Sequence, residues 1–111
     1  MALLRASGEV RTLAEGIRTY RGEPNGMRER VAAVRDRAEE TQVHAAEVGM
    51  LAPARLAESA DQVASAASDL ARDVLAKTDL DKGIPIDDPD VAKLVDSIAA
   101  FRRAAVEHAA N

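Results

Sequence analysis

The chain has 111 residues, a formal net charge of -4 and no cysteine, which excludes disulfides, thiolate metal sites and cysteine nucleophiles. Alanine fills 24 positions, and Tyr20 and Phe101 are the only aromatic residues. No stretch approaches the roughly 20 apolar residues that cross a bilayer, and charges at Arg5 and Glu9 come too early for a signal peptide. We therefore expect a soluble, cytoplasmic protein, with leaderless export left open, in which residues 1–111 form a single helical-bundle domain.

The first segment has the pattern of an amphipathic helix. Apolar residues recur at alternating spacings of three and four from Leu3 to Tyr20. Gly22 follows this pattern, where glycine often ends a helix, so we predict a helix over about 2–21. The turn-forming residues of 22–26 then predict a tight connection to an antiparallel second helix.

Two apolar seams with alternating spacings of four and three come next and predict helices over about 26–49 and 53–79. Where the seams meet, Val48, Ala52, Leu56 and Ala60 are each four residues apart. A continuous helix can accommodate this change of spacing if its supercoil unwinds locally. The seam members are Met27, Val31, Val34, Ala38, Thr41, Ala45, Val48 and Ala52, then Leu56, Ala60, Val63, Ala67, Leu70 and Val74.

Pro53 favours a corner between the two seams over 49–52. Its ring would clash with the carbonyl of Gly49 inside a helix, and Gly49 could serve as the C-cap. Beta-type alternation is absent from the chain, so the fold class is all-α. We predict an antiparallel up-and-down four-helix bundle, and the alternative is an extended helical hairpin with one long helix kinked at Pro53.

An aspartate-rich loop precedes the last predicted helix, over about 88–109. It resembles a calcium loop only in part, because Gly83 and Ile84 occupy the fifth and sixth positions of the window, where an acid or amide and a glycine belong. We prefer Asp87 as the N-cap, with Asp88 as the alternative, Pro89 in the first turn under either choice, and Asp90 near the positive end of the helix dipole. Whether the loop binds a cation stays open. The window's acids are Asp79, Asp81, Asp87 and Asp90, and the helix seam is Val91, Leu94, Ile98, Phe101, Ala105 and His108.

The search for chemistry yields no catalytic, cofactor-binding or metal residues that we would assign. Glu40, His44 and Glu47 share one side of the second predicted helix, but the chain lacks the second ligand set of a di-metal bundle. The serines of the third helix lack a nucleophile's sequence context, and the glycines form no phosphate loop. We therefore expect no enzyme and no cofactor. The serines are Ser59, Ser65 and Ser68.

Charge is unevenly spread: residues 1–37 hold eight arginines against five acids, and residues 38–111 hold seven basic against fourteen acidic side chains. The two parts could pack beside each other, be solvated separately, or steer association between chains. Nucleic acid is not expected as a partner, because no aromatic stacking platform accompanies the arginines. A membrane partner is not expected, and no small-molecule substrate is implied.

The expected function is helix–helix association, as a homo-oligomer or as a small partner subunit of a larger assembly. Apolar residues outside the main seams could form the contact surface. Two alternatives are an amphipathic helical protein that coats a lipid or granule surface, for which only the first helix has suitable residues, and a bundle with a metal or small-ligand site. The residues outside the seams are Leu4, Val43, Leu51, Leu75, Leu80, Val95 and Val106.

Overall fold

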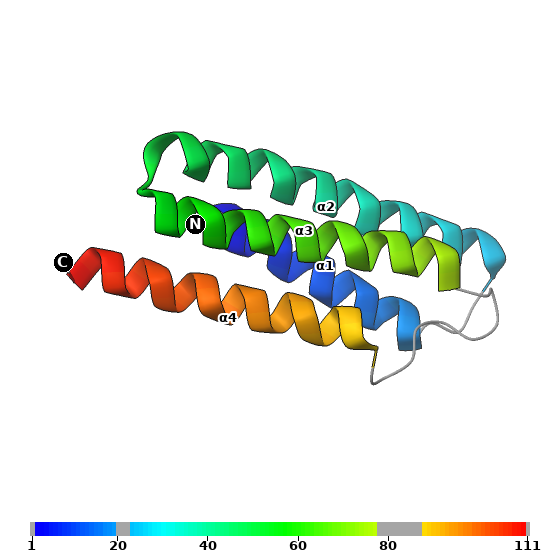
Figure 1. The fold of residues 1–111 in the computed structure, drawn as a ribbon. Helices are drawn as coiled ribbons and strands as arrows, with labels where there is room; N and C mark the ends of the chain where they lie inside the picture. Colours follow the sequence, from blue (N-terminus) through cyan, green and yellow to red (C-terminus); the bar gives the residue numbers. More distant parts are fainter. Residues whose placement is uncertain (1, 20–22, 78–87, 111) are drawn as a thin grey trace.

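The computed structural model describes residues 2–19, 23–77 and 88–110. They form four helices, α1 (Ala2–Thr19), α2 (Pro24–Leu51), α3 (Ala54–Lys77) and α4 (Pro89–Ala110). Successive helices run in opposite directions and lie side by side in a bundle measuring 50 × 23 × 18 Å (Figure 1). The predicted antiparallel four-helix bundle is confirmed, and the alternative of one long kinked helix is wrong.

The predicted seams form the core of this bundle. Each helix packs against the next in sequence, and α1 also contacts α3 and α4. Every member of the α3 seam is buried, and most described seam positions of α1 and α2 are buried. In α4, Leu94, Ile98 and Phe101 are buried, whereas Val91 and Ala105 are half-buried and His108, near the end of the helix, is exposed. In α1, Ala14 is more deeply buried than the predicted Leu13.

Both α1 and α3 contact all three other helices, and α3 packs the more extensively of the two because α2 and α4 both lie closely against it. A helix with neighbours on three sides must bury more than one narrow stripe, and α3 does so with small residues. Alanine side chains leave little bulk between helices, so neighbouring backbones can approach closely. The buried residues of α3 are Leu56, Ala60, Val63, Ala64, Ala66, Ala67, Leu70, Ala71 and Val74.

The corner between α2 and α3 is shorter than predicted. Helix α2 continues through Gly49 to Leu51, so the predicted C-cap at Gly49 is wrong. Ala52 is the C-cap, with an extended backbone (φ -109°, ψ 160°), and its N–H donates to the Val48 carbonyl at 2.9 Å. The reason is that proline forces the preceding residue out of the helical region but leaves earlier residues free to be helical. The Pro53 carbonyl then accepts the N–H of Ala57 at 3.0 Å and starts α3.

Helix α2 also begins earlier than predicted, at Pro24 rather than near residue 26. Proline is favoured at the first helical position, where its missing N–H has no partner to lose. The Glu23 carbonyl accepts the N–H groups of Gly26 and Met27 at 3.1 and 3.3 Å, so these turn-forming residues belong to the first helical turn. The predicted end of the first helix at Gly22 lies outside the described residues.

Candidate functional site

A hollow of about 380 Å³ opens at the end of the bundle where the corner lies. We call this end the corner end: α1 and α3 begin there, and α2 and α4 finish there (Figure 1). Both histidines of the chain line this one hollow. The described residues that line it are Ala2, Leu3, His44, Glu47, Val48, Leu51, Ala52, Leu56 and His108.

The hollow exists because the last layer of the core is incompletely filled. Leu3, Val48 and Leu56 supply apolar walls from three helices, and Leu3 and Leu56 are buried. The remaining seam positions of this layer are the small Ala52 at the corner and the polar, exposed His108. Among the described residues, no bulky apolar side chain closes the layer, so apolar wall is left in contact with the hollow.

The polar side of the hollow is formed by His44 and Glu47 on α2 and by His108 on α4. Nδ1 of His44 lies 3.3 Å from Oε2 of Glu47, one helical turn away. Glu40, the third member of the predicted row, instead accepts a hydrogen bond from Arg37 at 2.7 Å. Among the described residues, the groups of side chains close enough to share a metal ion do not include this row.

The exposed large apolar residues among those described all belong to the C-terminal parts of α2 and α4. Because the bundle alternates in direction, these two helices end on the same side. Val43 is 58% exposed, Met50 78%, Leu51 89% and Val106 69%. We call these four side chains together with the hollow the corner surface. Met50 and Leu51 are adjacent beside the hollow, whereas Val106 lies on α4, with which the described residues of α2 make no contact. Adjacent exposed apolar side chains are a mark of an interaction site.

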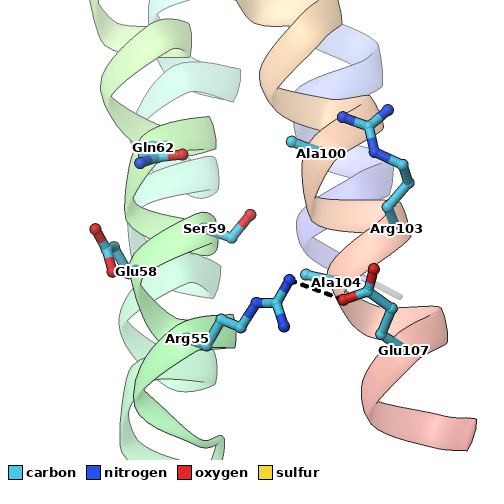
Figure 2. A pocket seen from close by; sticks show the side chains of 8 residues that line it. All are labelled: Arg55, Glu58, Ser59, Gln62, Ala100, Arg103, Ala104 and Glu107. Atoms are coloured by element: carbon cyan, nitrogen blue, oxygen red, sulfur yellow. Dashed lines mark ion pairs between the residues drawn. The ribbon is translucent and has the colours of Figure 1, made fainter.

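A second, polar groove of about 340 Å³ lies between α3 and α4 (Figure 2). Nη2 of Arg55 and Oε2 of Glu107 span it at 2.8 Å. Small side chains at Ser59, Ala100 and Ala104 keep the helices from filling it. The Arg55–Glu107 pair is largely exposed and therefore contributes little to stability. No histidine lines this groove, so Ser59 has no imidazole base there.

The other two serines of α3 are no better placed for catalysis. Ser68 accepts a hydrogen bond from Gln42 of α2, and Ser65 is exposed. Within the described part of the chain, no hydrogen bond joins a serine to either histidine. That the protein is not an enzyme stays a prediction.

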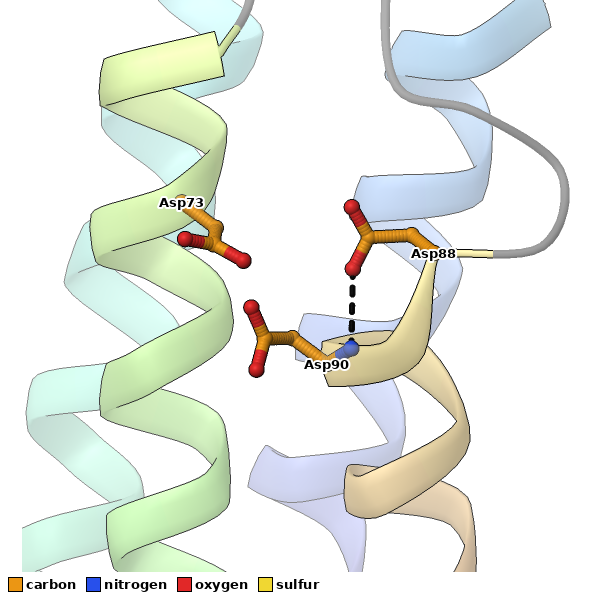
Figure 3. A group of neighbouring side chains, drawn as sticks. All are labelled: Asp73, Asp88 and Asp90. Atoms are coloured by element: carbon orange, nitrogen blue, oxygen red, sulfur yellow. Dashed lines mark hydrogen bonds between the residues drawn. The ribbon is translucent and has the colours of Figure 1, made fainter.

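Three carboxylates meet at the opposite end of the bundle, where α4 begins beside α3 (Figure 3). Asp73, Asp88 and Asp90 each place an oxygen within 4.8 Å of the others. Asp88 is only 3% exposed, and its Oδ1 accepts the N–H of Asp90 at 2.9 Å. Its carbonyl accepts the N–H of Ala92 at 3.3 Å. Asp88 is therefore the N-cap of α4, with Pro89 at the first helical position.

The sequence prediction for this region is partly confirmed. Pro89 and Asp90 lie in the first turn as expected, but the cap is Asp88 rather than the preferred Asp87. The predicted calcium-loop positions at Asp79, Asp81 and Asp87 lie outside the described residues. Carboxylate oxygens are the ligands of hard cations such as Ca²⁺. Here the helix cap explains the positions of Asp88 and Asp90, and we assign the cluster no ligand.

Comparisons with protein-family models, with curated proteins and with solved structures gave no match. None of the described helices combines the length and the apolar character needed to span a bilayer. The function is therefore inferred from the geometry of this chain.

Replacing Asp88 by alanine should lower the free energy of unfolding by about 1 kcal/mol, because the Asp90 N–H loses its acceptor. Asp88→Asn keeps a capping oxygen and removes one of three neighbouring negative charges, so its loss should be smaller. Urea unfolding followed by circular dichroism measures both. Equal losses for the two variants would show that charge, and not the cap, is what Asp88 contributes.

Proposed function

We propose that the protein is a non-catalytic helical module that binds another protein through the corner surface. The observation that carries this proposal is the strongly exposed pair Met50 and Leu51 beside the hollow, at one end of a bundle whose core is already buried. Because the seams are used inside the bundle, a partner has to contact the outer surface. Among the described residues, the large apolar side chains most exposed to water belong to the corner surface.

The charges around the corner surface support apolar contact over electrostatic steering. Arg55 is paired with Glu107 at 2.8 Å, so these opposite charges neutralise each other locally. A strongly steered partner would need a field of one sign. The charge asymmetry along the sequence therefore does not enter the proposal.

Surface coating by α1 is less well supported by the structure. Its large apolar residues Leu3, Val10 and Ile17 are at most 1% exposed and belong to the core. A lipid or granule surface could bind this apolar face only if α1 first left the bundle, which would expose the core. The corner surface needs no such rearrangement.

Site-specific photo-crosslinking in the producing cell tests the proposal. A photoreactive residue at Leu51 should give one discrete adduct with another protein, because this side chain projects from the corner surface. The matched control places the same residue at Ala92, an exposed position at the far end of α4. It should give no such adduct.

Three outcomes count against the proposal. Equal adducts from both positions would indicate nonspecific contact. An adduct of twice the chain mass would indicate a second copy in place of another protein. Failure of Leu51 to crosslink would remove the corner surface as the contact region.

A further inference from the structure

We infer that Met50 is a reversible oxidation site, at which a hydroperoxide converts the thioether into a sulfoxide and thereby weakens the binding of a partner at the corner surface. The inference rests on the proposed function and adds to it a means of regulation. The chain has no cysteine, so methionine thioethers are its only sulfur groups. Sulfoxide formation at methionine is reversible, because reductases return each epimer to the thioether.

The two described methionines differ in how accessible their side chains are. Met27 is 2% exposed and belongs to the hydrophobic core, whereas Met50 is 78% exposed in the last turn of α2. A methyl group built at the neighbouring Gly49 would meet no atom of another element within 4 Å, so the space beside Met50 is open. An oxidant, and later a reductase, can therefore reach Met50 without any opening of the bundle.

The reaction transfers one oxygen atom to the Met50 sulfur. A lone pair of the sulfur attacks one oxygen of hydrogen peroxide, the O–O bond breaks and an S–O bond forms. The released hydroxide takes the proton of the transferred oxygen and leaves as water. The sulfur loses two electrons, and the two peroxide oxygens together gain them. The product carries a polar, chiral sulfoxide where an apolar side chain stood.

Oxidation at this position changes the surface of the bundle and not its fold. Met50 lies outside the buried core, so its sulfoxide is hydrated in the free protein and breaks no core contact. In a complex, the same group beside the apolar Leu51 would lose its water, which costs free energy unless the partner supplies a hydrogen bond. A bound partner would cover the sulfur, so oxidation acts on the free chain and lowers its affinity for the partner.

Hydrogen peroxide treatment of the full chain, followed by tryptic digestion and mass spectrometry, tests the site. The three methionines fall in separate tryptic peptides, 1–5, 22–28 and 38–55, so each is quantified by itself. Met50 should gain oxygen at least tenfold faster than Met27, and circular dichroism should stay unchanged while Met27 is still reduced. Methionine sulfoxide reductases of both classes with a thiol reductant should remove the oxygen. Equal rates at Met27 and Met50, or loss of helix once Met50 is oxidised, would overturn the inference.

The effect on binding is measured in the crosslinking experiment with the photoreactive residue at position 51. Met50→Gln places a polar amide there and should reduce the adduct at least fivefold. Met50→Leu is the matched control, because it keeps an apolar side chain that cannot form a sulfoxide, and its adduct should equal that of the unaltered Met50. Brief exposure of the cells to hydrogen peroxide should reduce the adduct of the chain with Met50 and leave that of Met50→Leu intact.

These experiments separate the inference from the proposed function. If the adduct forms and neither Met50→Gln nor peroxide reduces it, the inference is wrong and the proposed function stands. If peroxide reduces the adducts of both the chain with Met50 and Met50→Leu, oxidation acts elsewhere, and the inference again fails alone. If no adduct forms although Met50 is oxidised selectively and reversibly, the proposed function fails, and the regulation inferred from it fails with it.

Discussion

Replacing Pro53 by alanine should raise the dimerisation constant by several orders of magnitude, by forming an exchanged dimer with α2 and α3 joined into one helix. The wild-type corner consists of Ala52 and Pro53 alone, between helices that end at Leu51 and begin at Ala54. Without the proline, residues 52 and 53 can both adopt the helical conformation, so α2 and α3 can join. Short links between helices are a known route to such exchange.

The expected size of the effect follows from the cost of proline inside a helix. That cost is about 3 kcal/mol, and an exchanged dimer contains two such positions, so the substitution favours it by about 6 kcal/mol. Each 1.4 kcal/mol is tenfold, which makes roughly four orders of magnitude in the dimerisation constant. The entropy lost on association is the same for wild type and variant and cancels in the comparison.

Sedimentation equilibrium at several protein concentrations measures this shift. Pro89→Ala is the matched control, because Pro89 occupies a first helical position where proline is favoured, and its dimerisation constant should match the wild type. Adding Ala52→Gly to Pro53→Ala should reverse part of the shift, since glycine disfavours the continuous helix. A Pro53→Ala variant no more dimeric than the Pro89→Ala control would show that packing, and not proline, holds the corner.

Replacing Phe101 by alanine should lower the free energy of unfolding by about 3 to 5 kcal/mol. Phe101 is fully buried and is the largest of the fully buried side chains. The surrounding core is rich in small residues such as Ala60, Ala64 and Ala67, which cannot extend to fill the space that the ring leaves. Against a typical stability of about 5 to 15 kcal/mol for a domain, this loss leaves the fold marginal.

Urea unfolding measures the loss, with two comparison variants. Phe101→Leu should lose less, because leucine refills much of the volume. Val106→Ala, five residues further along α4 and 69% exposed, should change the free energy of unfolding by less than about 0.5 kcal/mol. A loss below about 2 kcal/mol for Phe101→Ala would mean that the neighbouring helices close over the gap.

The four helices and most of the core could be predicted because spacing alone carries that information. The seam from Leu56 to Val74 is buried at every predicted position. Residues spaced alternately three and four apart lie on one face of a helix, so the sequence predicts which face is buried. The helix ends were less predictable. Glycine at position 49 is compatible both with a helix that ends there and with one that continues. Pro53 forces Ala52 out of the helical conformation, and this determines that α2 ends at Leu51.

Only part of the corner surface could be predicted from the sequence. Val43, Leu51 and Val106 were recognised as apolar residues outside the seams, and all three are exposed. The hollow could not be predicted, because it depends on how four helix ends align in space. Nothing in the sequence near His44 indicates that His108 will line the same hollow. The same holds for Asp73 and Asp90, which only the pairing of α3 with α4 brings together.

The alanines at the centre of α3 also determine how the protein responds to temperature. A core made largely of methyl groups hides less apolar surface per residue than one of leucine and phenylalanine. The heat capacity change of unfolding scales with the apolar surface that unfolding exposes. A small change in heat capacity makes the curve of stability against temperature shallow. Because a core of small residues buries little apolar surface per residue, we expect the fold to keep nearly constant stability over a broad range of temperature.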